Sequence, residues 1–280
     1  MFQRTIKKNI EFKGIGLHTG CNSTVNLIPA PPDTGIIFRR TDLNGFCIEA
    51  SWENVEKVFY ATSLMKKGVY ISTVEHLLSA LYALKIDNLY IDIDEMEVPI
   101  LDGSSLPFVE KIMEVGILRQ KKKAEYFCVN SEIEVKEDDK WVKAIPFEGF
   151  KISYEIDFPH PAIGNQFFSS EIDEKTYREE ISWSKTFGFL KDIEFLKKNG
   201  LIRGGNMENA IVLSENSIIN REKLRDSSNF VKHKVLDFIG DLSLLGKRVK
   251  GHFIAYKSGH KMHTLLVKEI IKKVGEKIVG

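Results

Sequence analysis

One histidine and two aspartates recur at four-residue intervals in the stretch FVKHKVLDFIGDL, residues 230–242. On a helix, His233, Asp237 and Asp241 would form one stripe, because residues four apart lie one above the other. The remaining positions are mostly apolar, which is typical of a buried helix. Buried carboxylates are costly unless a positive group meets them. We therefore expect a positive partner beside this stripe, and a metal ion is one candidate.

A third candidate ligand is His76, which lies in the predicted helix STVEHLLSALYALK, residues 72–85. Two histidines and one carboxylate are a common catalytic zinc shell, with the fourth position left for water. His233 and Asp237 can reach one ion because they are four residues apart, and His76 would complete the set if the two helices face each other. The H-x-x-x-D spacing alone is unspecific, and a hydrogen bond on the helix surface is the alternative.

Two further residues could transfer protons at such a site. Glu75 directly precedes His76, and it could either close a capping box with Ser72 or take a proton from metal-activated water. His260 starts the last predicted helix, where the helix N-terminus disfavours the charged imidazolium. Asp241 is its natural partner and would favour that charge. The sequence alone does not decide which of these two effects prevails.

The other histidines have weaker claims to a role. His252 and His263 have the setting of surface or packing residues, whereas His160 in the turn-like FPHPAIG could contact a ligand. His18 lies on the glycine-rich turn GIGLHTG. This turn is no dinucleotide fingerprint, because no strand-turn-helix context follows it.

The pattern of the chain predicts a duplicated α+β unit. Predicted strands fill TIKKNIEF, STVNLIPA, GIIFRR and FCIEA in the first half, and CVNSEIEVK, WVKAIPF and FKISYEIDF in the second. Each half then ends with a helix, a strand and a helix: residues 72–85, 88–94 and 104–116, then 233–246, 249–259 and 260–275. We predict two similar domains, 1–122 and 123–280, in which facing helices bring His76 to the stripe. The run Lys121–Lys123 at the boundary is interpreted as a solvated linker.

Composition limits the class of protein. The 280 residues include 40 basic and 39 acidic side chains, so the net charge of +1 favours no nucleic-acid partner. Three cysteines without a C-x-x-C pair fit a reducing cytosol, and we expect a cytoplasmic protein. No run approaches the roughly 20 apolar residues of a transmembrane segment. No long exposed apolar seam is evident, so a monomer is expected.

Several motifs together resemble one family. GIGLHTG, ISTVEHLLSAL, VPILDGSS, KTFGF, HKVLDFIGDL and AYKSGH follow one another in the order found in bacterial UDP-3-O-acyl-N-acetylglucosamine deacetylases. These are zinc amidohydrolases of the committed step of lipid A biosynthesis, and the resemblance runs from about Thr5 to about Glu269. It implies two β-α-α-β sandwich domains with opposed helix layers and an insert in each, the second near residues 188–213. It also implies one Zn²⁺ per chain, although a His/His/Asp shell accepts Fe²⁺ too.

The resemblance assigns roles to individual residues. His76, His233 and Asp237 would be the zinc ligands, Glu75 the general base, and His260 the catalytic histidine that Asp241 orients and charges. Other residues would bind the small-molecule substrate UDP-3-O-acyl-N-acetylglucosamine. Thr186 would hydrogen-bond the oxyanion, Phe187 would form a wall, Lys234 would hold a phosphate, and the acyl passage would be lined by Leu17, Ile193, Ile202, Ala210 and Val212. The chain departs from the family pattern at Ser184–Phe187 and Gly204–Met207, which affects the expected shape of the acyl passage.

Two alternatives belong to other classes. A zinc amidase or peptidase could use the same centre on another amide, and cleavage of peptides but not of the UDP-sugar would favour it. A non-catalytic sugar-nucleotide or lipid-binding relative would be expected to lose Glu75, His260 or a metal ligand. All of these residues are present.

Overall fold

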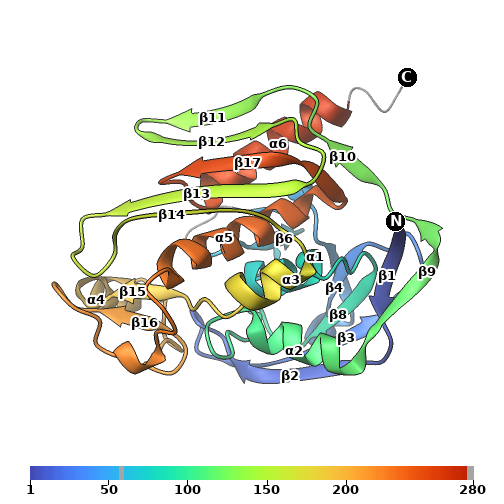
Figure 1. Ribbon diagram of the computed structural model, residues 1–280. Coiled ribbons are helices and arrows are strands. Elements are labelled where there is room, and N and C mark those ends of the chain that lie inside the picture. The colour runs from blue at the N-terminus through green and yellow to red at the C-terminus, as the bar shows by residue number, and fades with distance from the viewer. Residues whose placement is uncertain (57–59, 276–280) are drawn as a thin grey trace.

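The computed structural model describes residues 1–56 and 60–275, in which two sheets share one strand order (Figure 1). The first sheet has the order β2-β3-β8-β4-β5 and the second β11-β12-β17-β13-β14, with β10 paired to β17. In both sheets the central strand is antiparallel to one neighbour and parallel to the other. This correspondence confirms the predicted α+β duplication.

The strands of the first sheet are β2 (Ile10–Ile15), β3 (Asn22–Pro29), β4 (Ile36–Arg40), β5 (Phe46–Glu49) and β8 (Leu89–Ile93). Those of the second are β10 (Tyr126–Cys128), β11 (Ile133–Glu137), β12 (Lys140–Ile145), β13 (Phe150–Phe158), β14 (Gly164–Glu171) and β17 (Arg248–Tyr256).

The helices form two layers between the sheets (Figure 1). Helices α1 (Glu75–Ala83) and α2 (Leu106–Val115) flank β8 in the chain, and α5 (Asn229–Leu242) and α6 (His260–Gly275) flank β17. Helix α1 packs against α5 across the middle of the molecule. Both helices are therefore buried on nearly all sides, which explains why α5 lacks a broad polar face. Helix α5 begins four residues before the predicted start at His233.

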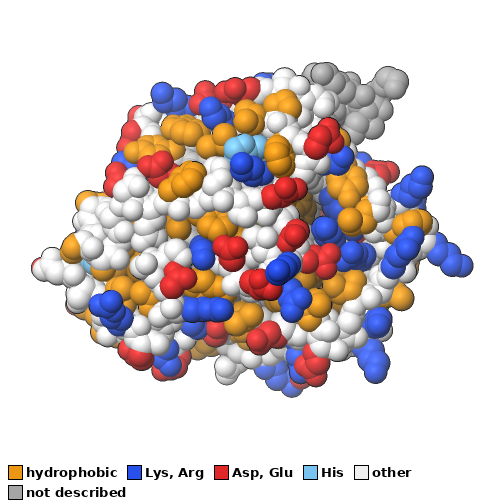
Figure 2. Space-filling view, in the orientation of Figure 1, with side chains coloured by type: hydrophobic (Ala, Val, Ile, Leu, Met, Phe, Trp, Pro, Cys, Tyr) orange, Lys and Arg blue, Asp and Glu red, His pale blue; other side chains and the backbone are white. Residues whose placement is uncertain are grey.

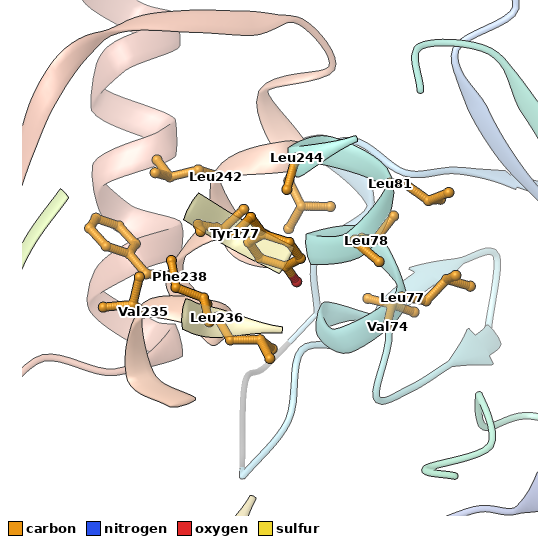
Figure 3. Packing of buried hydrophobic residues seen from close by; sticks show 14 of the residues in the cluster. Val74, Leu77, Leu78, Leu81, Tyr177, Val235, Leu236, Phe238, Leu242 and Leu244 are labelled. Carbon is orange, nitrogen blue, oxygen red and sulfur yellow. The ribbon is translucent and has the colours of Figure 1, made fainter. Parts of the chain in front are cut away.

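Apolar side chains from the two helix layers interdigitate around one tyrosine (Figure 3). Leu78 of α1 points toward Tyr177, which lies between α1 and α5 near Leu236, whereas Leu77 and Leu81 point to the opposite side of α1. Tyr177 comes from a π-helical turn, Tyr177–Ile181, that follows the short helix α3 (Glu174–Thr176). Its hydroxyl donates to Ser79 Oγ at 2.8 Å and lies 2.9 Å from Ser105 Oγ. Both layers are thus joined by polar contacts as well as by the hydrophobic core.

Two small additions extend the sandwiches. One is the hairpin of β6 (Leu64–Lys66) and β7 (Val69–Ile71). The other consists of β15 (Phe187–Phe189), α4 (Leu190–Lys198) and β16 (Ile211–Leu213), close to the insert expected at residues 188–213. It lies at one end of the molecule beside the N-terminal end of α5 (Figure 1). Single-turn 3-10 helices occur at Thr41–Leu43, Trp52–Asn54, Arg221–Lys223 and Ser243–Leu245.

The segment interpreted as a linker is a strand, so that prediction was wrong. Strand β9 (Ile117–Lys123) contains Lys121–Lys123 and pairs with β1 (Phe2–Ile6). The three lysines are exposed, which accounts for the polar sequence, but their backbone belongs to a two-stranded ladder. The domain boundary between residues 122 and 123 falls at the end of this strand and stays a prediction.

The surface carries both signs of charge. Figure 2 shows acidic and basic side chains intermixed over one face of the molecule, in keeping with the net charge of +1. Among the described residues, no helix combines the length and apolar character needed to cross a membrane.

Candidate metal centre and active site

The three predicted metal ligands meet where α1 packs against α5. Asp237 Oδ1 lies 3.4 Å from His233 Nε2 and 3.8 Å from His76 Nε2. The two imidazole rings are 5.1 Å apart between centroids and nearly perpendicular, at 77°. Two ligands held about 2.1 Å from a tetrahedral ion lie roughly 3.4 Å apart, so these separations fit one shared ion.

The hydrogen bonds of these residues leave the ligand atoms available. His233 Nδ1 donates to the carbonyl oxygen of Ser184 at 3.1 Å, and Nε2 therefore carries the lone pair that a metal requires. Asp237 Oδ1 is buried without a hydrogen-bond partner in the described part of the chain. A buried carboxylate oxygen facing two imidazole nitrogens without a shared proton is the pattern expected of a cation site.

Electrostatics favours the protonation states that metal binding needs. Burial and the neighbouring His233 lower the pKa of His76 to about 3, and burial also lowers the pKa of His233. Burial acts to raise the pKa of Asp237, but His233 and Lys234 outweigh it and hold this pKa far below its usual range. The histidines are therefore neutral and the aspartate is charged at neutral pH, as metal ligands must be.

Glu75 does not close the predicted capping box. Helix α1 has Val74 at its N-cap position, and the Ser72 hydroxyl donates instead to Met96 O. The Glu75 carboxylate faces the site and accepts the Thr62 backbone N–H through Oε2 at 3.1 Å. Burial raises the pKa of Glu75 to about 8, which suits a group that takes up and returns a proton near neutral pH. The capping alternative is wrong because the helix starts at Glu75 itself.

His260 lies opposite Glu75 and is paired with Asp241, as the spacing suggested. His260 Nδ1 lies 2.8 Å from Asp241 Oδ2, while Nε2 lies 3.8 Å from both Glu75 Oε1 and Asp237 Oδ2. Burial lowers the pKa of His260, but Asp241 raises it more, to about 9. The carboxylate therefore prevails over the helix N-terminus, and the ring is protonated with Nε2 facing the site.

His263 was expected to be a surface or packing residue, and it is buried but also bonded to Asp241. Its Nδ1 lies 2.8 Å from Asp241 Oδ2, and its ring stacks on Phe238 at 4.3 Å. The other ring nitrogen, Nε2, lies 3.1 Å from the Tyr154 hydroxyl. Its position three residues after His260, on the same helical face, is a signal that could have indicated this contact.

The segment KTFGF lies against the ligand helix. Phe187 is 6.2 Å from His233 between ring centroids, and Lys234 Nζ lies 5.6 Å from the Phe187 ring. Asn229 at the start of α5 holds this segment, because its side chain accepts from Lys185 N and donates to Lys185 O. Thr186 is fixed by its backbone, whose N–H donates to Gly103 O and whose carbonyl accepts from Ile211 N.

The predicted acyl-passage residues fall into separate groups. Leu17 and Ile202 both lie within 4 Å of the Cβ position of Gly205, because the loop after α4 packs on the turn GIGLHTG. Gly204 permits this approach, since a Cβ there would overlap Gly16 O. Val212 is buried in β16 beside Gly188, whereas Ile193 lies on α4 and Ala210 precedes β16. The structure thus brings Leu17 and Ile202 together, and a passage formed by all five residues stays a prediction.

A cavity of about 270 Å³ opens next to His260. Three lysines, Lys140, Lys257 and Lys261, line it together with Glu137 and Tyr60. Lys234, the predicted phosphate ligand, instead lies beside the metal site, 2.8 Å from Asp237 Oδ2. The lysines come from β12 and from both sides of His260, so only the fold places them together.

The remaining histidines make structural contacts. His160 Nε2 lies 2.9 Å from Ser214 O and Nδ1 accepts from Ala162 N, so its ring fixes a turn to the insert. His252 Nε2 lies 2.9 Å from Ser153 Oγ. His18 is buried, and its backbone N–H donates to the carboxylate of Glu97 at 2.9 Å, which anchors the turn GIGLHTG.

The fold and this centre define a class: a two-sandwich α+β protein in which a candidate metal-ligand set, His76, His233 and Asp237, meets Glu75 and His260 between opposed helices. A family model described as UDP-3-O-acyl N-acetylglycosamine deacetylase matches residues 3–272. The protein named UDP-3-O-acyl-N-acetylglucosamine deacetylase from Syntrophus aciditrophicus (strain SB) is 45% identical over 273 residues, which cover 97% of this chain and 87% of that protein. A protein of the same name from Thioalkalivibrio sulfidiphilus (strain HL-EbGR7) is 46% identical, with 96% and 90% covered. The chain belongs to the family of UDP-3-O-acyl-N-acetylglucosamine deacetylases.

Proposed function

We propose that this chain is a zinc-dependent hydrolase that removes the N-acetyl group from UDP-3-O-acyl-N-acetylglucosamine, the committed step of lipid A biosynthesis. It would act in the cytoplasm as a monomer. The observation that carries this proposal is the buried His76–His233–Asp237 cluster beside Glu75 and His260, whose carboxylate and imidazole lie 3.8 Å apart. Membership of the family supports the reaction and its substrate.

A zinc ion held by His76, His233 and Asp237 would polarise both the acetamide carbonyl and the attacking water. Iron(II) suits the same ligand set. Asp241, His260 and His263 form a neighbouring cluster that needs no ion, because each imidazole Nδ1 lies 2.8 Å from the same carboxylate oxygen and can donate to it.

Different side chains around this cluster would accept and donate the protons of the reaction. Glu75 takes a proton from the water as the water oxygen bonds to the carbonyl carbon. Thr186 would donate its hydroxyl hydrogen to the oxyanion, a contact often worth about 3 kcal/mol in the transition state. Protonated His260 faces the same space and supplies positive charge to the oxyanion or a proton to the leaving nitrogen. Cleavage of the C–N bond then releases acetate and the free 2-amino sugar nucleotide.

Residues outside the reacting centre would bind the rest of the substrate. Lys234 is assigned to a phosphate, and the lysines of the cavity beside His260 supply further positive charge for a diphosphate. Phe187 would form a wall of the site. Leu17, Ile193, Ile202, Ala210 and Val212 would receive the acyl chain.

The test is release of acetate from UDP-3-O-acyl-N-acetylglucosamine by the purified protein loaded with one equivalent of zinc. We expect turnover by the wild type, loss of zinc and turnover in His76→Ala, and loss of turnover with zinc retained in Glu75→Gln. His252→Ala is the matched control, because this histidine lies outside the centre, and it should behave as the wild type. Cleavage of other amides without cleavage of the UDP-sugar would overturn the assigned substrate.

A further inference from the structure

One buried threonine touches both members of the acid–base pair. Thr62 is fully buried just before the β6–β7 hairpin of the first sandwich. Its backbone N–H donates to Glu75 Oε2 at 3.1 Å, and its carbonyl accepts from Val74 N. The backbone of Thr62 is therefore fixed to the residues at the start of α1.

The side chain of Thr62 points to the second sandwich. Its hydroxyl donates to Asp241 Oδ1 at 2.5 Å, and its oxygen lies 3.1 Å from His260 Nδ1. Since the other oxygen of Asp241 accepts from His260 and His263, the hydroxyl of Thr62 satisfies the remaining half of this carboxylate. Asp241 is completely buried, so no solvent could replace that hydrogen bond.

These contacts close a ring of three groups. The Thr62 hydrogen goes to Asp241, and the His260 Nδ1 hydrogen lies between Asp241 Oδ2 and Thr62 Oγ1. Such a ring fixes the rotation of the carboxylate and keeps the Nδ1–H of His260 directed at Asp241. His260 Nε2 is then directed to the space shared with Glu75 and Asp237.

We infer that Thr62 is a positioning residue for the reaction: it sets the geometry of the Asp241–His260 pair relative to Glu75. This inference rests on the proposed deacetylase activity. Thr62 does not touch the reacting atoms and acts through His260, so its hydroxyl should affect turnover rather than substrate binding. Loss of one hydrogen bond to a buried charged group lowers a rate by on the order of 10- to 100-fold when the group acts in the transition state.

The test compares Thr62→Val, which keeps the backbone N–H and the shape but removes the hydroxyl, with Thr62→Ser, which keeps the hydroxyl. We expect kcat of Thr62→Val to fall on the order of 10- to 100-fold, with KM and zinc content unchanged, and Thr62→Ser to stay within a few-fold of the wild type. Thr5→Val is the control for losing a buried threonine hydroxyl, because Thr5 Oγ1 accepts from Ala30 N in the first sandwich and has no other partner among the described residues. It should leave kcat unchanged.

A double-mutant cycle separates positioning from a general structural effect. In a His260→Ala background, the further change Thr62→Val should no longer lower kcat, because the group through which Thr62 acts is absent. An equal loss in both backgrounds would overturn the inference, as would wild-type kcat in Thr62→Val. If Thr62→Val does not fold, Thr62→Ala takes its place in both backgrounds. Absence of turnover in the wild type itself would refute the proposed function instead.

Discussion

Gly240 of α5 lies directly against the backbone of Glu75, the first residue of α1. A Cβ at Gly240 would overlap the carbonyl oxygen of Glu75, so no larger residue fits without separating the helices. The only glycine in α5 is thus at the point where this helix meets the first turn of α1, which carries Glu75 and His76. The distance between the side chains of Glu75 and His76 on α1 and those of His233 and Asp237 on α5 depends on this contact.

Gly240→Ala should destabilise the fold although alanine is the better helix former. The helix-propensity gain of about 1 kcal/mol is outweighed by overpacking against rigid backbone, which typically costs about 1–3 kcal/mol or more. Urea unfolding should therefore show a lower midpoint, together with weaker zinc binding. Gly188→Ala is the control, since nothing lies within 4 Å of its Cβ position, and its midpoint should change little. A Gly240→Ala protein as stable as the wild type would contradict the close packing.

Asp241→Asn should move the basic limb of the pH–activity profile to lower pH. Asp241 raises the pKa of His260, whose value is about 9, by stabilising the imidazolium. Asparagine supplies no negative charge, so the ring loses its proton at lower pH, and activity that needs the protonated ring is lost earlier as the pH rises. The measurement is kcat/KM against pH on zinc-loaded protein. Asp92→Asn is the control: it removes a carboxylate that is paired with Arg39 and should leave the basic limb in place. A basic limb that Asp241→Asn does not move would show that Asp241 does not control the protonation of His260.

Removal of metal should lower both activity and stability. Without an ion, Asp237 Oδ1 faces the neutral His76 and His233 and has no hydrogen-bond partner in the described part of the chain, and zinc can bind these three residues together only in the folded state. Free zinc at 100 times its Kd would add about 2.7 kcal/mol to the free energy of unfolding. Thermal melts before and after treatment with a chelator, and after zinc is returned, measure this difference. His76→Ala should melt at nearly the same temperature with and without zinc, and a zinc-dependent shift equal to that of the wild type would argue against this ligand.

Tyr177→Phe should weaken the contact between the helix layers without removing the centre. The change leaves the buried hydroxyls of Ser79 and Ser105 without their tyrosine partner, which costs about 1–3 kcal/mol. Chemical unfolding should report this loss, while zinc content stays at one equivalent. Tyr70→Phe removes an exposed hydroxyl and should change the free energy of unfolding by less than about 0.5 kcal/mol. Equal effects of the two substitutions would show that the Tyr177 hydroxyl adds nothing to stability.

The amino-acid pattern was enough to predict the local elements and their repetition. Strand alternation and helical periodicity identified the paired helix–strand–helix units, because both patterns are local properties of the chain. The stripe of His233, Asp237 and Asp241 also followed from periodicity alone, since four-residue spacing on a helix fixes neighbours without tertiary contacts. The prediction of a linker at Lys121–Lys123 was wrong because a run of polar residues is compatible both with a linker and with an exposed strand.

How the two halves meet could not be predicted before the fold was known. Thr62 and Asp241 are 179 positions apart, and no local pattern relates them. The opposing effects on the charge of His260 were visible in the sequence, but their balance depends on the 2.8 Å contact with Asp241 in a buried site. The sequence likewise left a capping role for Glu75 open, and the helix start excludes that role because it places the carboxylate beside Thr62. Distances and burial set the strength of electrostatic interactions, and both arise only when the two helix layers pack together.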